Sequence, residues 1–452
     1  MRLRNTLILA VVFVALGAYV YFVELQKAAD EAKKKTLVTF DTDQVTSVTL
    51  TYPDREIVLS KTDSGWRLSK PVDAPADETT VTNLLTAVST CEVKKTLDDV
   101  PDNLAPFGLD QPQATVTLKL KDKEIPAIRV GKTSPVGNST FVQRADEKKI
   151  YLTSSAFHSG MDKQVKDLRD KQILQFNDDD IRKISLMGGG RDVLLSKSDD
   201  SWTLEKPAGP YPADATAVRS LLSTLRSLRA TDFPAEGDLG AYGLEQPRLT
   251  VTLVSGKDDN EQQILLGGES DKKELYLKLG NQPTVYTVGS YVFKDVDKNV
   301  NDLRDKTVLA FDKDEVTRVE VAQGDEKPFV LRRDKEEWTL DGATGQPDRT
   351  KITQFITDLH DLKGYSIASD RPDSDTQFGL SPPRLTITVH GKDDQTVGTA
   401  RLGSYSPEAN KTEYSAARAG SPTIFLVREY LYKRLDKKPA DFVSAGTPTP
   451  AS

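Results

Sequence analysis

The residues of this sequence that could carry out chemistry are few and widely separated. The histidines are His158, His360 and His390, and no two of them have the HxH or HxxxH spacing of a metal site. Because a metal ion or a general base needs partners at close range, we expect surface or packing roles for them. Cys91 is the only cysteine, which excludes an intramolecular disulfide, a CxxC redox pair and a thiolate zinc site. We expect Cys91 to be a small core residue.

The segment VGKTS at 130–134 resembles the end of a phosphate-binding loop. The full pattern requires a glycine five residues before the glycine of Gly-Lys-Thr, and that position is Pro126. Similar segments farther along the chain read LGGES at 266–270 and LGSYS at 402–406, without the lysine. We therefore expect a hairpin turn at 130–134 and no nucleotide site.

Three acidic segments mimic the start of a calcium loop: DTDQV (41–45), NDDDI (177–181) and DKDEV (312–316). All three lack the glycine at the sixth position and the glutamate at the twelfth, so we expect capping turns. The GxSxG motif of a serine nucleophile is absent. We therefore predict no catalytic residues, no metal ligands, no cofactor-binding residues and no cofactor, and hence a protein that is not an enzyme.

The elements that would have to position such residues are repeated three times. One phrase reads FGLDQPQATVTL at 107–118, YGLEQPRLTVTL at 242–253 and FGLSPPRLTITV at 378–389. The three tryptophans of the chain, Trp66, Trp202 and Trp338, are spaced 136 residues apart. Solenoid repeats run about 20–50 residues, so this period indicates tandem duplication of a whole domain.

The repeated phrase has no acid, base or nucleophile in all three copies, since Asp110 becomes Glu245 and then Ser381. Its glycine suits a tight or left-handed turn, and the proline four residues after that glycine suits the first residue of a strand. We expect the aromatic residue and the leucine to be buried. The phrase is therefore predicted to be a joint in a scaffold and not a binding site.

One copy predicts mostly strands and a single clear helix. VTSVTL, EIVLSK and GWRLSK read as strands, whereas Val81, Leu84, Leu85 and Val88 recur at helical spacing within 76–89. The predicted fold class is α+β, with three tandem copies of a ~135-residue module that has a mainly antiparallel sheet and one or two helices. All three copies should share one fold, and the three tryptophans should be structural.

The N-terminus predicts a membrane anchor. Residues 5–23 are nineteen uncharged residues, which as a helix would span about 28 Å of a roughly 30 Å hydrocarbon layer. A cleaved signal peptide is the rival interpretation, but no small-x-small cleavage site follows the apolar run. The predicted organisation is an anchor and stalk (1–35), three modules (36–175, 176–310 and 311–442) and a disordered tail (443–452).

Composition narrows the class of partner. The net charge is −7 and the hydrophobic share is 37%, which suits several small cores in a slightly acidic chain. Binding to a nucleic-acid backbone needs clustered lysine and arginine, so we expect no nucleic-acid partner.

With these residues in view, the chain resembles domain-of-unknown-function family 4340 of bacterial envelope proteins. The resemblance rests on the N-terminal span and on copies of FDxDxV, WxL, aromatic-GLxxP, LG and LRDK. It implies proximity to an ABC-transporter permease, its ATPase and a gliding-motility-type auxiliary protein, beside which members are often encoded. No catalytic residues come with the family. The third copy departs from the pattern, because it lacks Lys-Pro after WTL and the arginine of LRDK.

These observations lead to one expected function and one alternative. We expect a non-enzymatic, membrane-anchored subunit or adaptor of an ABC-type export or motility complex. It would sit in the bacterial inner membrane as a single-pass protein with its bulk periplasmic or otherwise extracytoplasmic. Its partners would be inner-membrane lipid, through the N-terminal helix, and an ABC-transporter permease or auxiliary protein. The alternative is a free-standing envelope protein that binds a glycan or a peptide.

Overall fold

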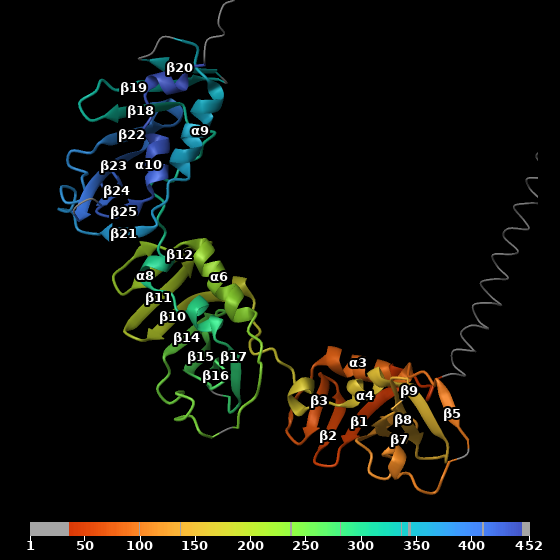
Figure 1. Cartoon of the computed structure of the whole chain (residues 1–452). Helices are drawn as coiled ribbons and strands as arrows, with labels where there is room; N and C mark the ends of the chain where they lie inside the picture. Colours follow the sequence, from red (N-terminus) through yellow and green to blue (C-terminus); the bar gives the residue numbers. More distant parts are fainter. Residues whose placement is uncertain are drawn as a thin grey trace, which may run out of the picture. The chain divides into compact units, whose positions relative to one another are not determined.

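The computed structural model describes residues 36–444, apart from 99, 136, 236, 281, 336, 342–344 and 409–410 (Figure 1). The chain separates into two compact units. The first runs to Ile173 and includes Arg229–Pro234, and the second holds Leu174–Leu228 and the chain from Ala235 onward. The predicted anchor and stalk (1–35) and the tail from residue 445 lie outside the described residues. Among the described helices, none has the length and apolar character needed to cross a bilayer.

The first unit contains one nine-stranded sheet in which every neighbouring pair of strands is antiparallel. The strand order is β4-β3-β2-β1-β6-β7-β8-β9-β5. The strands are β1 (Val45–Thr51), β2 (Glu56–Thr62), β3 (Gly65–Lys70), β4 (Ala74–Pro75), β5 (Lys95–Leu97), β6 (Ala114–Leu120), β7 (Glu124–Thr133), β8 (Ser139–Arg144) and β9 (Ile150–Ser154).

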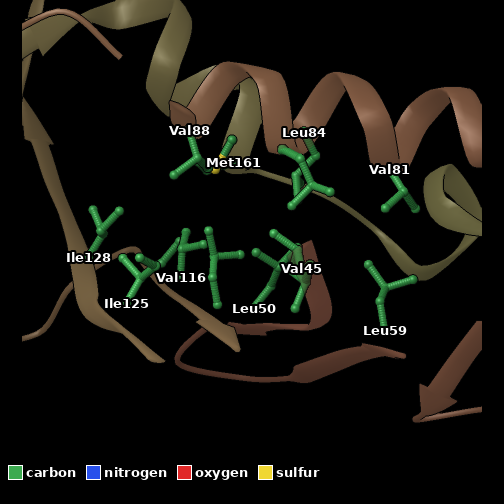
Figure 2. Close-up of a cluster of buried hydrophobic side chains, with 14 of the residues drawn as sticks. Val45, Leu50, Leu59, Val81, Leu84, Val88, Val116, Ile125, Ile128 and Met161 are labelled. Atoms are coloured by element: carbon green, nitrogen blue, oxygen red, sulfur yellow. The ribbon is translucent and has the colours of Figure 1, made fainter. Parts of the chain in front are cut away.

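Three helices accompany this sheet: α3 (Glu78–Ser89), α4 (Ser155–Met161) and α5 (Val165–Leu168). Helix α3 begins after Asp77, whose side chain accepts a hydrogen bond from the Thr80 backbone N–H at 2.8 Å. Its buried residues are Val81, Leu84, Leu85 and Val88, as their spacing predicts. Figure 2 shows this helix face packed over sheet residues such as Leu50, Leu59 and Val116.

The second unit contains two eight-stranded antiparallel sheets. The first has β10 (Ile181–Gly188), β11 (Arg191–Ser198), β12 (Ser201–Lys206), β13 (Tyr211–Pro212), β14 (Leu249–Ser255), β15 (Asn260–Glu269), β16 (Glu274–Leu279) and β17 (Val285–Gly289), with helices α6 (Ala215–Arg226), α7 (Tyr291–Val296) and α8 (Val300–Leu303). The second has β18 (Arg318–Gln323), β19 (Phe329–Asp334), β20 (Glu337–Asp341), β21 (Ser366–Ser369), β22 (Leu385–His390), β23 (Thr396–Glu408), β24 (Lys411–Arg418) and β25 (Ile424–Val427), with helices α9 (Arg349–His360) and α10 (Glu429–Leu435).

The three sheets repeat one topology, so the prediction of tandem modules with antiparallel sheets and few helices is confirmed. The orders β13-β12-β11-β10-β14-β15-β16-β17 and β20-β19-β18-β22-β23-β24-β25-β21 follow that of the first unit. We call them modules 1, 2 and 3. One difference concerns the segment after the long helix. It forms an edge strand in modules 1 and 3 (β5 and β21), whereas the segment of module 2, Arg229–Pro234, belongs to the first unit.

The tryptophans share a position in the repeat but differ in depth. Trp66 is buried, with 5% of its surface exposed, and belongs to the core of the first unit. Trp202 and Trp338 are half-buried. The structural role predicted for all three is therefore strongest for Trp66.

Candidate functional site

The repeated phrase forms the same turn in each module. Gly108, Gly243 and Gly379 have φ of +64°, +65° and +69°, which confirms the predicted left-handed position. Strands β6, β14 and β22 begin two residues after Pro112, Pro247 and Pro383, so this proline precedes the strand and is not its first residue. The leucines that follow the glycines are buried, as predicted: Leu109, Leu244 and Leu380.

The aromatic residue of each phrase packs against a second ring of the same sheet. The pairs are Phe107–Phe141, Tyr242–Tyr276 and Phe378–Tyr405, with ring centroids 5.0, 4.4 and 5.0 Å apart. Only Phe378 is fully buried, and Phe107 and Tyr242 are half-buried, so the predicted burial of the aromatic residue holds in full for one copy.

The backbone of the turn packs directly against the glycine of the LG motif. A Cβ atom at Gly131 or Gly267 would lie 2.3 Å from the carbonyl oxygen of Phe107 or Tyr242. At Gly403 it would lie 2.0 Å from the carbonyl oxygen of Gly379. The phrase and the LG motif, far apart in sequence, are therefore the two halves of one packing contact.

The prediction of a hairpin turn at 130–134 is wrong. Residues 130–133 lie inside strand β7, where Val130 pairs with Val142 and Thr133 with Thr140. The ladder continues across an irregularity between these pairs, and the sequence Val-Gly-Lys-Thr therefore stays extended.

Substitution of Gly267 tests the contact. We expect Gly267→Ala to lower the free energy of unfolding by about 1–3 kcal/mol, because the new methyl group must displace the Tyr242 carbonyl. Gly268→Ala is the matched control, since its Cβ would lie 3.6 Å from the same oxygen, an ordinary contact. Urea denaturation followed by circular dichroism measures both, and equal midpoints for the two variants would contradict the contact.

The acidic segments are capping turns, as predicted. Asp41 accepts a hydrogen bond from the Asp43 N–H at 3.0 Å and caps the 3₁₀ turn Thr42–Gln44. Asn177 and Asp312 accept equivalent bonds at 3.3 and 2.9 Å. Asp110 and Glu245 of the phrases are exposed.

The histidines do not come together. His158 is half-buried in α4 of the first unit, whereas His360 ends α9, with its Nδ1 2.6 Å from a carboxylate oxygen of Asp361. His390 lies in β22 with 6% of its surface exposed, and its Nδ1 is 3.1 Å from Nη2 of Arg318. Within the part of the chain that the structure describes, no group of three or more His, Cys, Asp or Glu could hold a metal ion.

Cys91 is a core residue, as predicted. Its side chain is buried, and burial raises the pKa of the thiol to about 12. A thiol with so high a pKa is a poor nucleophile at neutral pH, because the thiolate is the reactive form.

The sequence reading missed the role of the LRDK motif, which joins modules. In the second unit, Arg304 follows α8 and is 5% exposed. Its Nη1 and Nη2 donate to the two carboxylate oxygens of Asp370, at 2.7 and 3.0 Å. Its guanidinium carbon lies 3.6 Å from the centre of the Tyr211 ring. Arg304 therefore holds the segment after α9 of module 3 against the end of module 2.

The Thr423 hydroxyl adds a second donor to Asp370, at 2.8 Å. The hydrogen bonds from Arg304 are the main reason that the pKa of Asp370 lies below its usual value, although burial acts in the opposite direction. The carboxylate is therefore ionised and paired at neutral pH.

The first unit contains the same joint. Arg169, the arginine of the first LRDK, lies over the ring of Phe233, with its guanidinium carbon 3.8 Å from the ring centre. Nζ of Lys166 is 3.2 Å from Asp232, and the Ala230 N–H donates to the Lys171 carbonyl at 2.8 Å. We call residues 164–169 of module 1 and 299–304 of module 2, which carry Lys166, Arg169 and Arg304, the exit platforms of these modules. The corresponding residues of module 3 are 438–443, and we call them its exit platform.

The exit platform of module 3 borders a cavity of about 740 Å³. It lies between α9, α10 and the 3₁₀ turn Pro439–Phe442, and α9 and α10 are neighbours in Figure 1. The charged and aromatic residues that line it are Lys351, Phe355, Asp358, Arg434, Lys437, Asp441 and Phe442.

No curated protein matches this chain. A family model described as a domain of unknown function (DUF4340) matches three times, over residues 66–233, 206–376 and 345–446. The first two matches extend past an exit platform into the segment that the platform holds, so they include the joint. With three matches that together cover most of its length, the chain belongs to the DUF4340 family.

Proposed function

We propose that this chain is a non-enzymatic, membrane-anchored, extracytoplasmic subunit or adaptor of an ABC-type export or motility complex. The observation that carries the proposal is the structural role of the repeated residues. The glycine turn, the LG motif and the arginine of LRDK all serve packing within a module or the joint to the next segment. The residues that the three modules share therefore build a scaffold. A scaffold suits a protein that positions its partners.

The anchor and the orientation come from the sequence alone. The uncharged run of residues 5–23 is long enough to span a bilayer. An adaptor needs such a tether if it is to stay beside a membrane-embedded permease.

The cavity on module 3 favours the alternative, a protein that binds a peptide or a glycan. A glycan is the weaker candidate, because sugar recognition uses exposed aromatic faces, and the two rings at this cavity, Phe355 and Phe442, are both buried. A peptide partner fits both the alternative and the adaptor.

Isolation of the tagged full-length chain from native membranes in mild detergent tests the proposal. We expect a permease and its ATPase to be recovered in comparable amounts. The control is a chain whose residues 1–35 are replaced by a cleaved signal peptide, which should be released as a soluble protein without the permease. Recovery of the full-length chain alone, or with a bound glycan only, would contradict the proposal.

A further inference from the structure

We propose that the exit platform of module 3, with its adjoining cavity, binds an extended acidic segment of a partner protein. The inference deepens the proposed function and rests on it, since the partner would be a subunit of the complex. It starts from the fact that the same platform already holds such a segment twice within this chain.

The backbone of the platform is the same in all three modules. The N–H of the residue that caps the long helix donates to the platform at 2.8 Å in module 1, 2.8 Å in module 2 and 2.7 Å in module 3 (Asp77 to Leu168, Asp214 to Leu303, Asp348 to Phe442). The next platform residue then pairs with the chain just before that cap (Ala76 with Arg169, Ala213 with Arg304, Pro347 with Val443). Module 3 therefore repeats the backbone contacts between the platform and the cap of the long helix, and residue 443 takes part in them.

The occupants of the first two platforms share their chemistry. Each is an extended segment that follows a long helix, and each donates one backbone N–H to the chain just beyond the platform: Ala230 to Lys171 at 2.8 Å and Gly364 to Lys306 at 2.9 Å. Each also carries a carboxylate that a platform cation binds, Asp232 with Lys166 and Asp370 with Arg304. An acidic extended segment is thus what the platforms of modules 1 and 2 hold.

The side chains of the third platform differ from those of the first two at the positions that bind the occupant. Ala440 takes the place of Lys166 and Asn301, and Val443 takes the place of Arg169 and Arg304. The cations that hold the occupant in modules 1 and 2 are therefore missing from the platform itself.

The cavity supplies cations from a neighbouring position. In module 1 the two helices meet closely, since a Cβ at Gly160 of α4 would lie 3.9 Å from the Cβ of Ala87 of α3. In module 3 the corresponding positions are Arg434 and Asp358, which pair at 3.3 Å, and the cavity opens beside them. The larger side chains thus convert a closed helix contact into a groove that adjoins the platform.

Lys437 is the cation left for a ligand. It lines the groove, is half-buried, and makes no ion pair with a carboxylate among the described residues. The two carboxylates of the groove are already engaged, Asp358 by Arg434 and Asp441 by the Lys438 N–H at 2.8 Å. With Ala440 also lining the groove, the surface fits an acidic side chain next to an apolar one.

Site-specific photo-crosslinking in the native membrane tests the inference. A photoreactive residue replaces Ala440, and a second chain carries it at Tyr291, which is 70% exposed in module 2. We expect a crosslink from position 440 only, to a subunit that also co-purifies with the unmodified chain. The crosslinked peptide should be an acid-containing segment, and reversing that acid to lysine should abolish the crosslink.

Charge reversal provides the second measurement. Lys437→Glu should reduce crosslinking from position 440 by about tenfold, because it sets like charges against each other. Lys433→Glu is the matched control, since Lys433 is an exposed residue of α10 outside the groove, and it should leave the yield unchanged. Circular dichroism melting of both variants verifies that they fold.

The outcomes separate the inference from the proposed function. If the complex is recovered but position 440 crosslinks to nothing, or to a second copy of this chain, or if Lys437→Glu leaves the yield unchanged, the inference is wrong and the adaptor function stands. If no permease or ATPase is recovered at all, the proposed function fails first.

Discussion

Replacing Asp370 with alanine is expected to lower the free energy of unfolding of the second unit by about 3 kcal/mol, because it leaves the buried guanidinium of Arg304 without its carboxylate. The lower end of the range for buried pairs applies, since the Asp370 side chain keeps 33% of its surface exposed. Urea denaturation of the chain followed by circular dichroism measures the change.

Asp394→Ala is the matched control for this prediction. Asp394 also accepts two hydrogen bonds from one arginine of module 3, Arg318, at 2.5 and 2.9 Å. Its side chain is 62% exposed, and Arg318 keeps Glu320 as a second carboxylate partner, so the midpoint should hardly move. A double variant distinguishes the cost of an unpaired buried charge from the cost of lost packing. Arg304→Met combined with Asp370→Ala removes both charges and keeps an apolar stem over Tyr211, and should be more stable than Asp370→Ala alone.

The same pair predicts a dependence on pH. The pKa of Asp370 is lower in the folded chain than the value of about 3.9 in an unfolded one. Its contribution to stability is therefore fully present above the unfolded pKa, and it is lost as the pH falls through the lower folded pKa. The free energies of unfolding of wild type and Asp370→Ala should therefore converge as the pH decreases below 5. Urea unfolding curves of both proteins over this pH range measure the difference. Curves that stay equally far apart down to pH 2 would contradict the ion pair.

The sequence predicted the parts of the fold that depend on local pattern. The spacing of Val81, Leu84, Leu85 and Val88, at positions 0, 3, 4 and 7, requires only helix geometry, and the phrase glycines require only a turn. It failed at 130–134 because the extended form of this segment depends on pairing with β8 and on the close approach of the Phe107 carbonyl. Neither partner is visible from the five residues themselves.

The joint could not be predicted from the LRDK motif alone. Its role depends on Asp370, which lies 66 residues beyond Arg304, and on Tyr211, which lies before it. One signal was available: the third copy lacks the arginine of LRDK, where Val443 takes its place. The cavity was equally hidden, because it depends on the exchange of Ala87 and Gly160 for Asp358 and Arg434, which the aligned folds reveal.

Trp66→Ala is expected to be as damaging as loss of the Arg304–Asp370 pair, in the other unit. The substitution empties the space of a buried indole and should cost about 3–5 kcal/mol. Local hydrogen bonds hold this position, because the Trp66 N–H donates to Oε1 of Glu78 at 2.6 Å and the Trp66 carbonyl accepts from Ala76 at 2.9 Å. The neighbouring core therefore cannot easily shift to fill the cavity.

Trp202→Ala, at the same position of the repeat, is the control for Trp66→Ala. Trp202 is half-buried, so a smaller loss is expected, and it should affect the second unit and not the first. Differential scanning calorimetry of the chain can follow the two units, provided that they unfold as separate transitions. Equal melting of wild type and Trp66→Ala would mean that the indole does not support the core. It would also restore the hypothesis that the repeated tryptophans are stacking surfaces for a sugar, and with it the glycan-binding alternative to an adaptor.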